Sequence, residues 1–147
     1  MKCVPLALVA AMLVLATNTV WARDDIGDYS IEEAMGTADA KSKLGDEIKF
    51  YFGNQPHAAV EKNLGTVGTN KKTNAFGKSD KDACLWVFLS AMIALKDRAL
   101  QEGANAVVDI KSNYKNNETS SDTTFKCGAG AIMAGVALRG TLVKLAQ

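Results

Sequence analysis

The longest apolar stretch of the chain predicts a buried helix over residues 80–101. Within residues 83–95 only Ser90 is not apolar, and a helix that is apolar all round is buried on more than one side. Ser79 is a favourable N-cap, and Gly103 is the expected C-cap in a left-handed conformation. A single sheet covers one face of such a helix, so the other face needs a second helix, a partner chain or a bound apolar group.

Alternating apolar and polar positions predict strands on both sides of this helix. Residues 47–52 read EIKFYF, an alternation typical of a half-buried strand. Residues 60–76 are mostly polar and predict an exposed strand, and residues 104–114 predict another strand. In the latter we expect Val108, Ile110 and Tyr114 on one side and Asp109, Lys111 and Asn113 on the other.

The C-terminal region, residues 124–145, predicts one long or bent strand, or two strands, after a polar loop at residues 115–123. Four glycines punctuate it: Gly128, Gly130, Gly135 and Gly140. Glycines in such positions let a helix approach a sheet closely, or they mark bulges and bends.

A shorter helix is predicted near the start of the domain. Ser30 with Glu33 three residues later resembles a capping box, and the helix would run to about Ala40. The order helix, strand, strand, helix, strand, strand is typical of α+β domains. We therefore expect a mostly antiparallel sheet packed on one long apolar helix, plus a short N-terminal helix.

Residues 1–22 have the features of a secretory signal peptide. The segment begins with one positive charge, residues 4–16 are apolar but for one proline, and cleavage is expected between Ala22 and Arg23. The apolar run is too short to cross a bilayer without strain, so we expect no stable membrane anchor. The predicted organisation is a signal peptide followed by one domain, residues 23–147, that is periplasmic or secreted.

Composition limits the classes of function. The 147 residues include 48% apolar and 22% charged residues, which indicates a globular chain. The 17 basic and 16 acidic residues give a net charge of +1, and removal of the signal peptide takes away one lysine and no acid. Binding to phosphate backbones needs an excess of Lys and Arg, so we expect no nucleic-acid partner.

Two cysteines, Cys84 and Cys127, remain once Cys3 leaves with the signal peptide. An even pair in an exported protein predicts one disulfide, here between the long helix and the C-terminal strand region. Two buried free thiols are the alternative. With the single histidine, His57, the two cysteines are the only conceivable metal ligands, and they lack motif spacing, so we expect neither a metal nor a cofactor.

Several segments carry a resemblance to known proteins. Residues 91–110, which contain GANAVV, resemble the helix-to-strand corner of the YbjQ/RcsF-like superfamily of small α+β domains, some of them exported envelope proteins. Residues 49–53, 71–79, 84–90 and 103–108 resemble a group of short exported bacterial proteins often labelled "excinuclease ATPase subunit". The resemblance implies a YbjQ/RcsF-like fold and an envelope location, and it supplies no catalytic residues.

The sequence does not support the ATPase label. Gly77, Lys78 and Ser79 match the end of a phosphate-binding G-x-x-x-x-G-K-[ST] loop, but Lys72 occupies the position of its first glycine. The chain also has no C-x-x-C pair of a zinc finger. Gly77 is better explained as a turn residue and Ser79 as the helix cap.

The other candidate residues each have a structural explanation as well as a functional one. Asp109 either faces solvent or pairs with Arg139. Tyr114 beside Lys111 and Lys115 forms either a small recognition patch or a solvated strand end. No nucleophile elbow such as G-x-S-x-G accompanies the single histidine, so we expect no enzyme activity.

These features predict a small, disulfide-closed binding or interaction module of the bacterial envelope. Its partner would be another envelope protein, or a second copy of the chain, docked through the apolar helix. A metal or small-ligand binding protein with a pocket beside that helix is the alternative.

Overall fold

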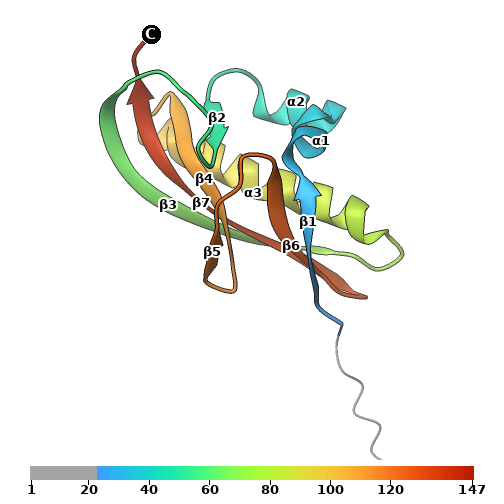
Figure 1. Cartoon of the computed structure of the whole chain (residues 1–147). Helices are drawn as coiled ribbons and strands as arrows, with labels where there is room; N and C mark the ends of the chain where they lie inside the picture. The colour runs from blue at the N-terminus through green and yellow to red at the C-terminus, as the bar shows by residue number, and fades with distance from the viewer. Residues whose placement is uncertain (1–22) are drawn as a thin grey trace, which may run out of the picture.

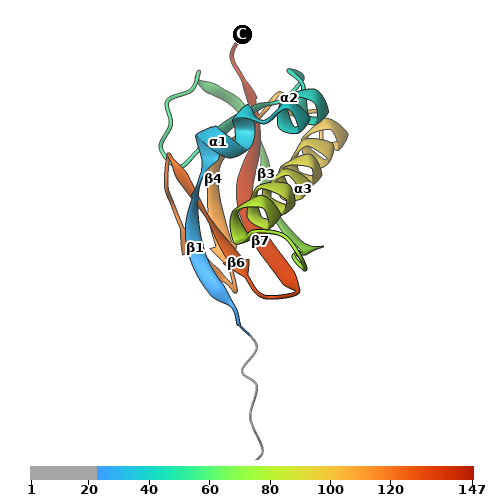
Figure 2. The same cartoon turned by 90° about the vertical axis from the view of Figure 1, so that its right-hand side faces the viewer.

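The computed structural model describes residues 23–147, which form a seven-stranded sheet with a long helix packed on one face (Figure 1; Figure 2). In chain order the elements are β1 (Asp25–Ser30), α1 (Ile31–Gly36), α2 (Ala38–Leu44), β2 (Lys49–Phe52), β3 (Val60–Asn74), α3 (Asp80–Gln101), β4 (Ala106–Tyr114), β5 (Asn117–Thr119), β6 (Thr124–Ala129) and β7 (Met133–Leu145). The α+β prediction is confirmed. The predicted signal peptide, with Ala22, lies outside the described residues.

β7 is the central strand of the sheet. β3 pairs with it antiparallel along nearly its whole length, from Leu145 to Met133. The other edge of β7 is shared, because β4 pairs with residues 138–143 and β6 pairs with residues 134–135. β4 in turn carries β5 and β2, and β6 carries β1.

The sheet is mixed, because β2 runs parallel to β4, whereas the other pairs of the described sheet are antiparallel. Parallel neighbours need a long crossover, and the chain between β2 and β4 supplies it as β3 and α3. Local alternation marks a strand without giving its direction relative to a neighbour. The sheet is mostly antiparallel, as predicted, but the parallel β2–β4 pair was not predicted.

The predicted long helix is α3, with the bounds expected from its sequence. The Ser79 side chain accepts a hydrogen bond from the Asp82 backbone N–H, which makes Ser79 the N-cap. Asp80 and Asp82 lie in the first turn, where carboxylates interact favourably with the helix dipole. No helix within residues 23–147 is long and apolar enough to span a bilayer.

The C-terminus of α3 differs by one residue from the prediction. Glu102, not Gly103, is the cap, and Gly103 follows it with a φ of 73°. The N–H of Gly103 donates to the Leu100 carbonyl and the N–H of Ala104 donates to the Ala99 carbonyl. These two hydrogen bonds form a Schellman motif. Its left-handed position directly after the cap is Gly103, and glycine adopts this conformation without strain.

The chain itself buries most of the apolar surface of α3. The sheet lies against one side, and α1 and α2 lie against another (Figure 2). Ile31, Ala34 and Leu44 of the short helices belong to the same buried core as the centre of α3. The exposed large apolar side chains of α3 are Trp86 and Leu100, at 44% and 46%.

The predicted N-terminal helix is two short helices. Ser30 caps α1 by accepting a hydrogen bond from the Glu33 N–H, as its capping box indicated. Thr37 then adopts an extended backbone and caps α2 by accepting from the Ala40 N–H. A second N-cap residue inside the segment thus divides one predicted helix into two.

Two strands, β1 and β5, were not predicted, and residues 124–145 were predicted as either one strand or two. β1, with the sequence DIGDYS, has little apolar alternation and is placed by its antiparallel pairing with β6. β5 lies inside the predicted polar loop, after a turn in which Lys115 and Asn116 have φ of 51° and 61°. Two successive positive φ values are typical of the type I′ hairpin turn. Residues 124–145 are two strands, β6 and β7.

The predicted alternation of β4 is wrong. Asp109 has a φ of 50°, and the register against β7 shifts between Val108 and Lys111, so β4 contains a β-bulge. Val107 and Ile110 therefore both lie in the core beneath α3, whereas Val108 packs in a separate cluster. The extra residue of the bulge reverses the side-chain alternation that the sequence analysis extended through the strand.

Cys84 and Cys127 form the predicted disulfide between α3 and β6. Their Cα atoms are 5.9 Å apart, and both residues are fully buried. The Phe88 and Phe125 rings stack in the same core, with centroids 4.1 Å apart. The covalent bond and the aromatic pair hold α3 on the strand that carries β1.

Removal of the disulfide is expected to destabilise the fold. The bond closes a loop with a sequence separation of 43, so the chain-entropy model gives a loss of about 4 kcal/mol in the free energy of unfolding of C84A/C127A. Urea denaturation with and without reductant measures it. Reductant should lower the free energy of unfolding of the wild type and leave that of the double variant unchanged. Titratable free thiols in the wild type would contradict the disulfide assignment.

Candidate functional site

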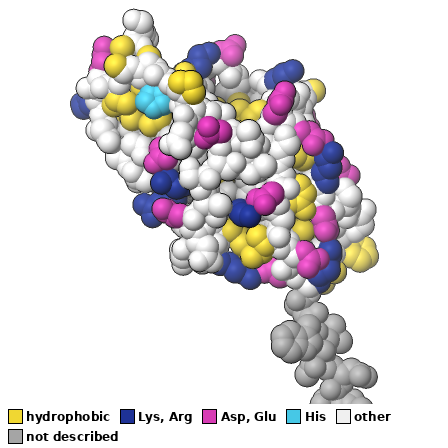
Figure 3. All heavy atoms as spheres, in the orientation of Figure 1, with side chains coloured by type: hydrophobic (Ala, Val, Ile, Leu, Met, Phe, Trp, Pro, Cys, Tyr) yellow, Lys and Arg dark blue, Asp and Glu magenta, His cyan; other side chains and the backbone are white. Residues whose placement is uncertain are grey.

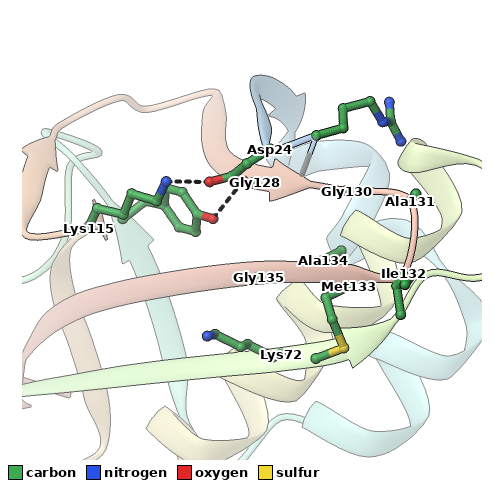
Figure 4. Close-up of a pocket in the computed structure, with 12 residues that line it drawn as sticks. Asp24, Lys72, Lys115, Gly128, Gly130, Ala131, Ile132, Met133, Ala134 and Gly135 are labelled. Carbon is green, nitrogen blue, oxygen red and sulfur yellow. Dashed lines mark hydrogen bonds and ion pairs between the residues drawn. The ribbon is translucent and has the colours of Figure 1, made fainter. Parts of the chain in front are cut away.

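A hollow of about 640 Å³ lies at the end of the sheet where β1, β3, β6 and β7 meet (Figure 4). Its floor includes the backbone of Gly128 and Gly135. Successive side chains of a strand point to opposite faces, and the neighbours Cys127 and Val136 lie in the core beneath α3. The hollow therefore opens on the face of the sheet that α3 does not cover.

The rim of the hollow combines apolar and basic side chains. Ile132 and Met133, where the chain turns from β6 into β7, are 65% and 48% exposed. Lys72 of β3 lies beside Met133 and has no ion-pair partner among residues 23–147. The face that α3 leaves open shows hydrophobic side chains in two areas, one around the histidine and one at this end of the sheet (Figure 3).

Tyr114 forms one wall and lies against two glycines. A Cβ on Gly128 would collide with the Tyr114 ring and hydroxyl, and one on Gly135 would lie 3.4 Å from Tyr114 Cε2. The tyrosine ring can contact the sheet only because these positions carry no side chain. The expectation that the glycines admit a helix is therefore wrong for these two, since they admit a tyrosine on the opposite face.

The other glycines of this region have separate roles. Gly140 lies opposite the β4 bulge, where a Cβ would come within 2.6 Å of Val107 Cγ1. Gly130 lies against the N-terminal residues, and a Cβ there would come within 2.6 Å of the Arg23 carbonyl oxygen. The prediction of bulges and bends thus holds at Gly140.

Asp24 joins the tyrosine wall to the N-terminal segment. Its carboxylate accepts a hydrogen bond of 3.1 Å from the Tyr114 hydroxyl and forms an ion pair with Lys115 (Figure 4). The hydrogen bond from Lys115, followed by that from Tyr114, holds the pKa of Asp24 below its ordinary value of 3.8. Burial, and then the hydrogen bond to Asp24, raise the pKa of the Tyr114 hydroxyl, so the phenol remains a neutral donor.

Arg23 fixes the same segment to α3. Its guanidinium donates to both carboxylate oxygens of Asp80, at 2.9 and 2.8 Å, and also to Asp25 at 3.0 Å. The hydrogen bonds from Arg23 hold the pKa of Asp80 below its ordinary value. The residue that follows the predicted cleavage point is thus bound to the N-terminus of the long helix.

The candidates from the sequence are only partly brought together. Tyr114 and Lys115 share the hollow, whereas Lys111 lies 3.3 Å from Asp109 and 3.9 Å from Glu118. The suggested Asp109–Arg139 pair is not formed, because the bulge turns Asp109 toward Lys111 and Arg139 pairs with Glu118 instead, at 3.4 Å. The recognition patch therefore contains two of its three proposed members.

The remaining candidates have structural roles. Gly77 has a φ of 73° in the turn before α3, where Ser79 is the cap. His57 is exposed, its Nδ1 is 2.7 Å from the Ala58 carbonyl oxygen, and its ring lies 5.4 Å from Tyr51. Among residues 23–147 no three His, Cys, Asp or Glu side chains are grouped to hold a metal ion.

Sequence reasoning missed Asp24 and the role of Gly128. Asp24 is 90 residues from Tyr114 in the chain, and no local pattern reports such a contact. The available signal was indirect: charged residues followed the predicted cleavage point, and glycines recurred in the C-terminal strands. Comparison with known proteins adds nothing to the assignment, since no family model, curated protein or solved structure matches the chain.

A side chain at position 128 is expected to disrupt the tyrosine wall. Because its Cβ would collide with Tyr114, G128A should lower the free energy of unfolding by about 1–3 kcal/mol. The same substitution in a Y114A background should cost much less, which a double-mutant cycle by urea denaturation measures. G36A, where a Cβ meets nothing within 4 Å, is the control, and equal costs in both backgrounds would exclude the proposed packing.

Asp24 is expected to contribute to stability in its charged form only. Its pKa is lowered in the folded state, so its contribution is complete above the ordinary value of 3.8 and is lost as pH falls through the lower folded value. D24N should therefore be less stable than the wild type at pH 7, and the two should converge in acid. D46N, which changes an exposed aspartate, is the control for thermal unfolding across pH, and parallel curves for D24N and wild type would refute the contribution.

Proposed function

We propose that the protein is an exported, non-enzymatic binding module of the bacterial envelope, with the hollow beside Tyr114 as its binding site. Export is supported by the signal-peptide pattern of residues 1–22. The buried Cys84–Cys127 pair at disulfide distance is consistent with an oxidising compartment.

A binding role is favoured over catalysis by the way the polar groups of the hollow are used. Asp24 is held by Tyr114 and Lys115, and Arg23 is held by Asp80. A general base or nucleophile has to be within reach of a substrate atom with its reactive group available. The carboxylate and the phenol of this site instead satisfy each other and fix the wall.

The hollow is a better candidate for the binding surface than α3. Docking through α3 was expected because the helix is apolar on all sides, but the sheet, α1 and α2 cover it. The hollow lies on the opposite face of the sheet, so we place the binding site there and not beside the helix. The observation that carries the proposal is this glycine-floored hollow with its tyrosine wall and exposed apolar rim.

A small ligand is the second candidate, and the size of the hollow favours it. Small-molecule sites commonly have volumes of roughly 300–1,000 Å³ and are mostly apolar with a few placed polar groups. The hollow has about 640 Å³ and an apolar floor, and at its edge lies Lys72, which has no ion-pair partner among residues 23–147. This combination suits a molecule with an apolar body and an anionic group.

Binding of an apolar anion tests the proposal directly. The fluorescence of 1-anilinonaphthalene-8-sulfonate should rise and shift to the blue with the wild type, and dodecanoate should displace the dye. M133E places a carboxylate on the rim and should weaken binding by roughly tenfold. L100E changes a leucine of matched exposure on α3, 46% against 48%, and should bind normally. Equal dye binding by both variants would reject the hollow as the site.

A further inference from the structure

We propose that the end of the domain formed by residues 74–79 and 130–133, here called the apolar tip, docks reversibly on an anionic lipid surface. The proposal goes beyond the function suggested for the hollow and does not depend on a ligand there. It rests on exposed apolar side chains held in a fixed geometry and on unpaired positive charge around them.

The apolar tip carries three exposed large apolar side chains on two neighbouring loops. Phe76 is 75% exposed, Ile132 is 65% exposed and Met133 is 48% exposed. The two loops are joined, because the Ala75 N–H donates to the Ile132 carbonyl at 2.6 Å. A group of exposed large apolar side chains on one edge of a small domain is typical of an interaction surface.

The exposure of Phe76 is imposed by a constrained loop. Ala75, directly before it, is 3% exposed and anchors the loop in the core. The Phe76 N–H donates to Asn74 Oδ1 at 2.8 Å, and the Lys78 N–H donates to the Ala75 carbonyl at 3.1 Å. The loop therefore holds the phenyl ring outward, where it is available to an apolar medium.

The charges that surround the apolar tip are complementary to anionic lipid. Lys71, Lys72 and Lys78 have no ion-pair partner among residues 23–147. Of the neighbouring acids, Asp24 and Asp80 are paired with Lys115 and Arg23, so among residues 23–147 the three unpaired lysines face one unpaired acid, Asp82 in the first turn of α3. Unpaired lysines around exposed apolar side chains match a bilayer, which presents anionic headgroups above an apolar interior.

The start of the described chain lies at the same end of the molecule. The Arg23 carbonyl oxygen lies beside Gly130, at the base of the apolar tip. The 22 residues that precede Arg23 include the apolar run 4–16 of the predicted signal peptide. The residue next to the predicted signal peptide therefore lies at the same end of the domain as the apolar tip. The occupant itself is chosen by charge, because unpaired lysines beside exposed apolar side chains favour an anionic lipid surface.

Vesicle binding with a fluorescent reporter at the apolar tip tests the proposal on the processed protein. Trp86 is the only tryptophan after residue 22, so F76W in a W86F background carries a single reporter. With vesicles that contain phosphatidylglycerol its emission should shift to the blue and be quenched by brominated acyl chains. L100W in the same background is the control and should do neither.

Matched variants separate the apolar and the electrostatic contributions. F76S should lower the partition coefficient by roughly tenfold, since burial of one aromatic ring is lost. K71Q/K72Q should lower it by more than tenfold at low salt and have little effect at high salt. L100S should bind as the wild type does, and circular dichroism should show all variants to be folded.

Two outcomes would overturn the proposal. One is the absence of binding to phosphatidylglycerol vesicles, and the other is equal binding to phosphatidylcholine vesicles with no loss in F76S. Phe76 does not line the hollow, so F76S should still bind the naphthalene dye. The hollow and the apolar tip share Ile132 and Met133, so F76S is the variant that distinguishes them. If F76S loses vesicle binding but still binds the dye, lipid docking is assigned to the tip. If the protein fails to bind the dye but binds vesicles, the lipid-docking result stands.

Discussion

The burial of α3 is the constraint on which the rest of the structure depends. Between Ala83 and Ala99 the helix has nine fully or nearly fully buried residues, more than one sheet face can cover. The sheet therefore lies on one side and α1 and α2 lie on another, with the Cys84–Cys127 bond holding the helix to β6. This arrangement uses the apolar surface of the helix for folding, so the helix has little left to offer a partner.

Within residues 23–147 no helix packs on the opposite face of the sheet, which is covered by its own side chains. At one end Val108, Val143 and Leu145 pack with Tyr51 in a small cluster of their own. At the other end Tyr114 lies against Gly128 and Gly135, and its ring covers only part of the strand backbone at these glycines. The uncovered part of this face is the hollow. The site is thus a consequence of placing α3 on one face of the sheet and glycines on the other.

Features of the fold that depend on local sequence were predictable, whereas features that depend on pairing between distant segments were not. The bounds of α3, its Ser79 cap and the strand ending at Phe52 follow from periodicity and capping. The parallel β2–β4 pair, the bulge at Asp109 and the placement of β1 depend on contacts between distant segments. The site follows the same division. Tyr114 and Lys115 were candidates from their local sequence, whereas Asp24 becomes visible only when β1 is placed beside β6.

The N-terminal residues connect the predicted processing step to the fold. If cleavage occurs after Ala22, the first two residues of the processed chain are those that bind Asp80 and Tyr114. Cleavage two residues later would remove both contacts, free Asp80 at the start of α3 and leave the Tyr114 hydroxyl without its acceptor. The fold therefore places a structural requirement on the predicted cleavage position, in addition to the sequence pattern. The same contacts hold the first described residues beside the hollow, so an intact site requires that Arg23 and Asp24 remain in the chain.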